Sequence, residues 1–264
     1  MKYVLVTGAR GGMGKAAVRA LKESGYFVFA LDRTDLDERK ENIFPLTADI
    51  TNEQSILKAF EQVRSVTDTL YAVLHFAGIY SLHSLVEMSG ENLQRVFEVN
   101  LLGAARINRI FLPLLKSGSR IVITTSELAP LDPLPFTGVY AISKSALDKY
   151  AYSLRMELQL LGISVVVLRP GAVDTGMLDV STDALEKFCQ NTKLYPCNSK
   201  RFQRIVERVE ARKIPTWKIG KKAVKILQVK RPKFVYKINR NPLLLLLNAL
   251  PRRWQTAIIK QILR

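Results

Sequence analysis

The chain has 264 residues, of which 48% are apolar; this is enough for one large domain with a buried core and excludes a disordered protein. Its only cysteines are Cys189 and Cys197, so neither a disulfide framework nor a metal site is expected, and a reducing, cytoplasmic compartment is the default. The net charge of +17 lies wholly in residues 200–264, which hold 19 bases and two acids, because residues 1–199 hold 21 of each.

Short apolar runs typical of strands alternate with helical patterns along the chain. The predicted helices cover residues 13–23, 53–65, 91–112 and 138–161. Such alternation indicates βαβ units, and right-handed crossovers then give an α/β fold with a doubly wound parallel sheet (a Rossmann fold), with ligands at the carboxyl ends of the strands. We expect one domain over 1–264, with a lid and a basic, amphipathic helical C-terminal extension at 177–264. The predicted strands are 3–6, 27–31, 72–76, 120–125, 164–168 and 233–236.

A glycine-rich turn, TGARGGMG, closes the first predicted strand and opens the first helix. Glycines in such a turn let the backbone bend tightly and approach a pyrophosphate, which lies on the helix N-terminus. The other interpretation is an ordinary strand-to-helix loop. The turn therefore predicts a dinucleotide site with contacts from Thr7, Gly8, Arg10, Gly12, Met13 and Gly14.

Asp32 ends the second predicted strand. A carboxylate at this place suits the ribose hydroxyls of NAD and repels the additional phosphate of NADP. Arg10 and Arg33 are both able to meet that phosphate, so NAD is favoured while NADP stays open.

Asp49 and Ile50, in the sequence ADIT, follow a third extended piece. Because the piece would end at the ligand edge of the sheet, Asp49 is expected to face the adenine. The alternative is that Asp49 caps the helix that begins after Thr51.

Tyr140 and Lys144, in the sequence YAISK, lie four residues apart and so share one face of a helix, with Cβ atoms roughly 5–6 Å apart. A neighbouring ammonium favours the phenolate form of tyrosine. A tyrosine base acting near neutral pH needs its pKa of about 10 lowered by roughly 3 units, which is about 4 kcal/mol. One surface lysine does not supply this, whereas a lysine and an oxidised nicotinamide in a closed site would. The alternative is that both are ordinary helix-surface residues.

The chain resembles the short-chain dehydrogenase/reductase family over roughly residues 1–180. The resemblance implies a single-domain Rossmann enzyme that moves a hydride between a nicotinamide and an alcohol or ketone carbon. It rests on motifs that occur in one order: TGARGGMG, ADIT, HFAG at 75–78, EVNLLG around Asn100, ITTSEL around Ser126, YAISK, and RPGAVDT at 169–175.

The resemblance implies a role for each of four residues. Tyr140 would exchange a proton with the substrate oxygen, and Lys144 would lower the tyrosine pKa and bind the nicotinamide ribose. Ser126 would hold the substrate oxygen, and Asn100 would anchor a water that links the lysine to solvent. The cofactor contacts implied beyond the glycine turn are Ala77, Gly78, Asn100, Tyr140, Lys144, Pro170, Gly171, Val173 and Thr175.

The chain departs from the family pattern in three places. His75 and Phe76 replace two asparagines, and we interpret them as a satisfied strand residue and a packing residue. Ser126 lies 14 residues before Tyr140, one more than is common, which leaves Thr125 as the alternative hydroxyl. The turn also fits the glycine spacing of the sugar-nucleotide epimerase branch, whose members are usually longer.

The basic tail has three interpretations. Residues 199–213 and 218–230 have apolar residues at helical spacing with bases between them, and 241–264 join a leucine run to Trp254. These helices either cover the pocket or lie on an anionic membrane, where each base contributes about 1 kcal/mol. The run Leu243–Leu247 is too short to span a bilayer. Nucleic acid is not expected as a partner, because the aromatic residues form no stacking array.

The apolar residues near the expected pocket predict a lipophilic substrate. By resemblance this is a steroid, a retinoid or a long-chain lipid. The alternatives are a soluble enzyme for a small polar carbonyl and a non-catalytic, cofactor-binding protein tethered by its tail. A homodimer formed through helices 91–112 and 138–161 is what relatives suggest. The apolar residues are Leu128, Leu131, Leu134, Phe136, Met177 and Leu178.

Overall fold

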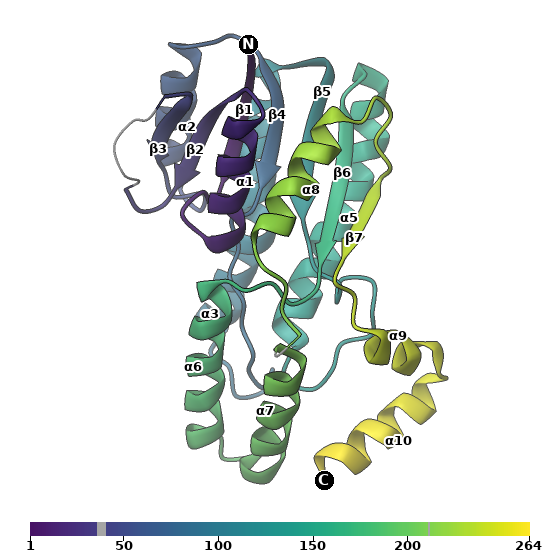
Figure 1. The fold of residues 1–264 in the computed structure, drawn as a ribbon. Helices are drawn as coiled ribbons and strands as arrows, with labels where there is room; N and C mark the ends of the chain where they lie inside the picture. Colours follow the sequence, from purple (N-terminus) through teal and green to yellow (C-terminus); the bar gives the residue numbers. More distant parts are fainter. Residues whose placement is uncertain (36–40, 211) are drawn as a thin grey trace.

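The structure is a computed structural model that describes residues 1–35, 41–210 and 212–264, and the side chains of these residues except 177–182, 209 and 210. Seven parallel strands form one sheet in the order β3-β2-β1-β4-β5-β6-β7, with helices on both faces (Figure 1). This confirms the doubly wound α/β fold. The strands are β1 (Lys2–Thr7), β2 (Tyr26–Asp32), β3 (Ile43–Thr47), β4 (Leu70–His75), β5 (Leu115–Thr124), β6 (Ser164–Pro170) and β7 (Val235–Ile238).

The helices fall into two groups. Those that cover the sheet are α1 (Gly12–Glu23), α2 (Glu53–Arg64), α4 (Gly103–Phe111), α5 (Gly138–Leu158) and α8 (Trp217–Gln228). Those that lie beyond the carboxyl ends of the strands are α3 (Gly90–Phe97), α6 (Gly176–Asn191), α7 (Pro196–Glu210), α9 (Pro242–Ala249) and α10 (Arg252–Leu263) (Figure 1). Short turns complete the set: η1 (Glu98–Leu102), η2 (Leu112–Leu114) and η3 (Gln159–Leu161).

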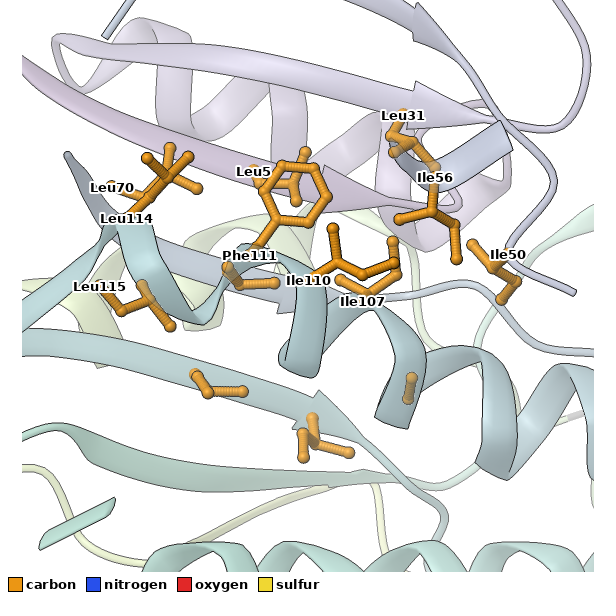
Figure 2. Close-up of a cluster of buried hydrophobic side chains, with 14 of the residues drawn as sticks. Leu5, Leu31, Ile50, Ile56, Leu70, Ile107, Ile110, Phe111, Leu114 and Leu115 are labelled. Atoms are coloured by element: carbon orange, nitrogen blue, oxygen red, sulfur yellow. The ribbon is translucent and has the colours of Figure 1, made fainter. Parts of the chain in front are cut away.

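Alternating side chains of the strands build two separate cores. In β1, Leu5 points to the face covered by α2, α4 and α5, whereas Val4 and Val6 point to the face covered by α1 and α8. Figure 2 shows the first core, in which Phe111 of α4 lies beside Leu5. Both faces are therefore buried, which explains why the strands are nearly continuous apolar runs.

A third apolar cluster lies outside the sheet, at its carboxyl end. It joins Phe136, from the loop before α5, to residues of α6, α7 and α10. Two contacts hold the C-terminal helix there: Asn198 Nδ2 donates to the Leu263 carbonyl, and Arg252 pairs with Asp132. The helices beyond the sheet thus have an apolar core of their own.

The structure differs from the predicted elements in three places. The strand β3 is not among the predicted strands, although an extended piece was expected before Asp49; Pro45 interrupts its apolar run, and an edge strand tolerates proline. The helix expected over 91–112 contains the π-helical turn η1. Within the expected C-terminal extension, α8 and β7 complete the sheet and its cover, so only the remaining helices lie outside the layered domain.

We predict that Gly220→Ala destabilises the fold. A Cβ at Gly220 would lie 2.5 Å from the Ala16 carbonyl oxygen and 3.0 Å from Ala20 Cβ, so α8 would be pushed away from α1. Such overpacking costs about 1–3 kcal/mol of unfolding free energy, measured by urea denaturation. Gly90→Ala is the matched control, because its Cβ meets no described atom within 4 Å. Equal unfolding free energies for the two variants would contradict the prediction.

Candidate active site

Three of the four residues with a predicted catalytic role line a cavity at the carboxyl ends of β4, β5 and β6, whereas Asn100 is not in its described lining. Thr124, Ser126, Tyr140 and Lys144 line it, and so does the segment that follows β6. A second cavity adjoins it through shared lining residues, among them Gly78, and extends along the carboxyl ends of β1 and β2. The two cavities together cross the point where the strand order reverses between β1 and β4, the usual ligand site of such sheets.

Tyr140 faces this cavity from the first turn of α5. Its ring makes an edge contact with Tyr80, with ring centroids 4.5 Å apart. Burial raises the pKa of Tyr140 to about 12; a hydrogen bond with Ser126 acts in the opposite direction, and the negative charge of Glu127 raises it further. The tyrosine is therefore a protonated acid, which is the form that can donate a proton.

Lys144 is buried one helical turn after Tyr140. Its Nζ donates to the Thr124 carbonyl oxygen at 3.2 Å and lies 5.9 Å from the centroid of the Tyr140 ring. Burial lowers the pKa of Lys144 to about 8. The causes of the raised Tyr140 pKa are burial and Glu127, and the Lys144 ammonium is not among them.

Asn100 is held in the π-helical turn η1. Its Oδ1 accepts from the Ile79 backbone N–H at 2.8 Å, and its Nδ2 donates to the Ile79 carbonyl and to Ser143 Oγ. A Cβ on Gly78 would lie 3.2 Å from Asn100 Oδ1 and 3.3 Å from Lys144 Nζ. Asn100 and Lys144 thus approach Gly78 from two different helices.

The two candidate hydroxyls near Tyr140 are separated by their partners. Thr125 Oγ1 donates to Asp148 Oδ1 at 3.3 Å, and Asp148 is also paired with Arg169 at 2.6 Å. Ser126, in contrast, makes a hydrogen bond with Tyr140. The geometry favours Ser126 over the alternative Thr125.

The glycine turn packs as a pyrophosphate cradle requires. Gly8 has φ = +68°, and a Cβ there would lie 2.5 Å from the Ala77 backbone nitrogen. A Cβ on Gly14 would lie 2.0 Å from the Gly8 carbonyl oxygen. Gly11, the N-cap of α1, has no side chain to bind the first N–H groups, so these N–H groups suit a phosphate.

Asp32 is placed as a ribose partner would be. Its Oδ2 accepts from the Arg10 backbone N–H at 2.9 Å, which fixes the carboxylate beside the turn. Arg10 and Arg33 are exposed at the same cavity, which Asp32 also lines. This part of the site holds one fixed acid and two exposed bases.

Asp49 also lines this cavity, together with Ile50. Its Oδ1 accepts from the backbone N–H and the hydroxyl of Thr51, whereas the N-cap of α2 is Asn52. The alternative of Asp49 as the helix cap is therefore wrong.

The two residues that replace the family asparagines are both buried. His75 Nε2 lies 2.8 Å from Asn108 Oδ1, and burial lowers the pKa of His75 to about 4, so the ring is neutral and satisfied. The Phe76 backbone N–H bonds to the Thr7 carbonyl and so continues the pairing of β4 with β1.

The segment after β6 closes the cavity against the glycine turn. A Cβ on Gly12 would lie 2.8 Å from Thr175 Cγ2, so the turn and the segment are in close contact. Pro170, Gly171, Val173 and Thr175 all line the cavity, as does Met13. With the cradle and Asp32, these residues fit a dinucleotide that crosses both cavities.

Some cavity residues were not predicted. Glu127 lies within the ITTSEL motif but had no predicted role, and Tyr80 lies two residues after the HFAG motif. Leu244 of α9 and three residues of α7 contribute apolar walls, in line with the interpretation that the C-terminal helices cover the pocket. Leu128 and Leu134 line the cavity as expected, Phe136 packs in the third apolar cluster, and the side chains of Met177 and Leu178 lie outside the described residues. The α7 residues are Phe202, Ile205 and Val206.

Comparison with known proteins agrees with this geometry. The family model described as short chain dehydrogenase matches residues 2–186. The chain is 28% identical to the 3-ketodihydrosphingosine reductase of Bacteroides thetaiotaomicron, over 96% of this chain and 93% of that protein. It is 28% identical to the human 17-beta-hydroxysteroid dehydrogenase type 6, over 75% of this chain and 65% of that protein.

A solved structure supports the fold across the whole chain. A short-chain dehydrogenase from Streptomyces avermitilis superposes with a TM-score of 0.76 at 18% identity, covering 99% of this chain and 93% of that one. The helices beyond the sheet are included in that coverage.

We predict that Lys144→Met stabilises the protein at neutral pH while it disables the site. The pKa of Lys144 falls from 10.5 to about 8 on folding, so the unfolded chain holds more protons between these values and stability rises with pH across that window. Below about pH 8 the buried ammonium lowers the free energy of unfolding by its full amount, which is at most about 3 kcal/mol. Urea denaturation at about pH 7 should show a more stable variant, and the difference should shrink by about pH 10.

The control is Lys149→Met, which removes an exposed lysine from the same helix and should leave the pH dependence unchanged. A Lys144→Met variant that is less stable than the parent at neutral pH would show that burial of the ammonium is not a net cost.

Proposed function

The chain belongs to the short-chain dehydrogenase/reductase family and is an NAD(P)-dependent enzyme, and we propose that it interconverts a ketone and a secondary alcohol on a lipophilic substrate. The observation that carries the proposal is the cavity itself. Ser126 and Tyr140 line it together with apolar side chains, among them Ile79, Val206 and Leu244. A ketone oxygen placed at the hydroxyls would leave its apolar chains among these walls.

In the proposed reaction Tyr140 is the general acid and base. In reduction the phenol donates its proton to the substrate oxygen, and its raised pKa keeps that proton available. The Ser126 hydroxyl holds the same oxygen in place. The nicotinamide, when bound, supplies or accepts the hydride.

In this proposal Lys144 and Asn100 support the transfer of the Tyr140 proton. The Lys144 ammonium stabilises the phenolate that remains after the proton leaves, and it binds the ribose of the cofactor. Asn100, fixed by both backbone groups of Ile79, holds the water that connects Lys144 to solvent. The proton lost by Tyr140 is thereby replaced between turnovers.

The substrate class follows from the walls and from the relatives. The relative aligned over nearly its whole length is named for a 3-ketodihydrosphingosine, and a second is named for a 17-beta-hydroxysteroid. A long-chain or polycyclic lipid ketone accordingly fits better than a small polar carbonyl. NAD is the proposed cofactor, because the fixed Asp32 carboxylate favours ribose hydroxyls. NADP is tested beside it, because Arg10 is able to meet the additional phosphate.

We predict that Tyr140→Phe lowers kcat for a lipid ketone by about two to four orders of magnitude while leaving cofactor binding nearly unchanged. The change removes the acid but keeps the ring against Tyr80. The measurement is NADH and NADPH consumption with steroid, retinoid and long-chain ketones in micelles, beside a titration of cofactor fluorescence.

Tyr150→Phe is the matched control, because its hydroxyl accepts from Asn108 away from the cavity. A preference for sugars or polyols would overturn the substrate class. Cofactor binding without turnover of any carbonyl would favour the non-catalytic alternative.

The proposal includes an anionic lipid surface as a partner. Leu243 and Leu246 of α9 are 63% and 66% exposed, and Trp254 of α10 is 55% exposed. Arg253 and Lys260 are exposed on α10 as well. Apolar side chains with an aromatic residue and flanking bases are what an interfacial helix presents to a membrane. Among the described helices, none is long and apolar enough to cross a bilayer.

We predict that Trp254→Ser weakens flotation with vesicles that contain phosphatidylserine, by about threefold or more, at moderate salt. Trp217→Ser is the control, because Trp217 is similarly exposed, at 52%, but lies on α8 against the sheet. Flotation that depends on Trp217 instead of Trp254, or no flotation of the parent protein, would reject the docking face.

The expected homodimer also stays a proposal. Leu102 of η1 and Ile142, Tyr152 and Met156 of α5 are exposed apolar residues on the two helical segments named for it. Their exposure supports a contact with a second copy at this face.

A further inference from the structure

Glu127 is a charged residue of the cavity for which the proposed reaction has no use. It directly follows Ser126, and its backbone N–H bonds to the Pro170 carbonyl, which fixes its backbone at the carboxyl end of β5. In the described lining of the cavity, the charged side chains are Glu127 and Lys144. Lys144 acts on Tyr140 and the cofactor, so Glu127 needs another explanation.

The two oxygens of the Glu127 carboxylate have different surroundings. Oε2 accepts from the Asn241 backbone N–H at 2.7 Å, at the start of α9. Oε1 lies where a Cβ on Gly171 would approach to 2.8 Å, so the absence of a side chain at Gly171 leaves room for it. Oε2 is thus fixed by a hydrogen bond, whereas the space at Gly171 accommodates Oε1 without supplying a hydrogen-bond donor.

The carboxylate has no close basic partner in the part of the chain that the structure describes. The ion pairs found within 4 Å there do not include Glu127. Arg240 is exposed and acts on it only through its field, whereas burial raises the pKa of Glu127. A half-buried carboxylate beside apolar walls is costly unless something charged or hydrogen-bonding meets it.

The negative charge also acts on the reacting group, since it raises the pKa of Tyr140. It therefore opposes the phenolate that the reaction must form. A positive charge on the substrate, placed at Glu127, would cancel this effect and stabilise the carboxylate at once. For a neutral lipid substrate, a neutral residue in place of Glu127 would oppose the phenolate less.

We propose that Glu127 binds a protonated amine of the substrate, so that the preferred substrates are lipophilic amino ketones or amino alcohols. This inference rests on the proposed function and narrows its substrate class. Because Glu127 lines the same cavity as Ser126 and its charge acts on Tyr140, the amine lies near the reacting carbon. The apolar chain of the substrate then extends between α7 and α9.

The test compares two substrates that differ only in the amine. These are a long-chain 2-amino-3-ketone and the same 3-ketone without the amine, in neutral detergent micelles at about pH 6.5, where the amine is protonated. Their ratio of kcat/KM is measured for the parent protein, Glu127→Gln and Glu157→Gln. Glutamine keeps an oxygen that can accept from Asn241 and removes only the charge. Glu157 is exposed on α5, so its variant removes a charge outside the cavity.

The parent protein and Glu157→Gln should prefer the amino ketone by about tenfold to a hundredfold, which is the usual worth of a charge-assisted hydrogen bond. Glu127→Gln should bring the ratio close to one. Equal rates for both ketones in the parent protein would overturn the amine site but leave the proposed function intact. An amino-ketone preference that Glu127→Gln leaves unchanged would also overturn the amine site, and Glu127 would then serve only to hold the start of α9 through Asn241. Turnover of neither ketone would count against the proposed function itself.

Discussion

A buried ammonium at the carboxyl end of the sheet constrains the residues that pack around it. The Lys144 ammonium is removed from water and donates to the Thr124 carbonyl, and this burial lowers its pKa to about 8. Such a charge is tolerated only where rigid neighbours leave it space and polar surroundings. Gly78, which has no side chain to fill that space, and Asn100, held by the Ile79 backbone, provide both. The π-helical turn and the HFAG motif are therefore parts of one arrangement.

The same arrangement explains the opposite pKa shifts of the two central residues. Burial penalises the charged form of each, so the phenol becomes a weaker acid while the ammonium becomes a stronger one. In this state Tyr140 holds its proton firmly, which suits donation to a ketone. The lowering that a base requires must come from charges that arrive with the ligands. Positive charge on the nicotinamide, and in our proposal on the substrate, has the right sign for that.

Helices outside the sheet connect the reacting groups to the surface of the protein. Asn241 begins α9 and donates to Glu127, and three residues later Leu244 reaches the cavity. On the same helix, Leu243 and Leu246 face outward. A lipid surface that held α9 would thus lie one helix diameter from the cavity, about 10 Å. This continuity links the proposed membrane contact to the proposed lipid substrate.

The sequence by itself determined the sheet, the order of its motifs and the family, because strand periodicity, glycine turns and the Tyr–Lys spacing are local patterns. It also named the residues that the fold brings together at Tyr140, although their chemical roles stay predictions. It indicated β3 only as an extended piece before Asp49, since Pro45 interrupts this edge strand, and it left Thr125 and Asp49 with two interpretations each. The structure excludes Asp49 as the helix cap, because Asn52 caps α2 through the Ser55 backbone N–H. It also shows that Thr125 is engaged by Asp148, 23 residues along the chain, a contact that local patterns do not specify, while the role of Ser126 stays a proposal. Glu127 became visible in the same way: its meaning depends on Asn241, 114 residues away, and on the absence of a side chain at Gly171.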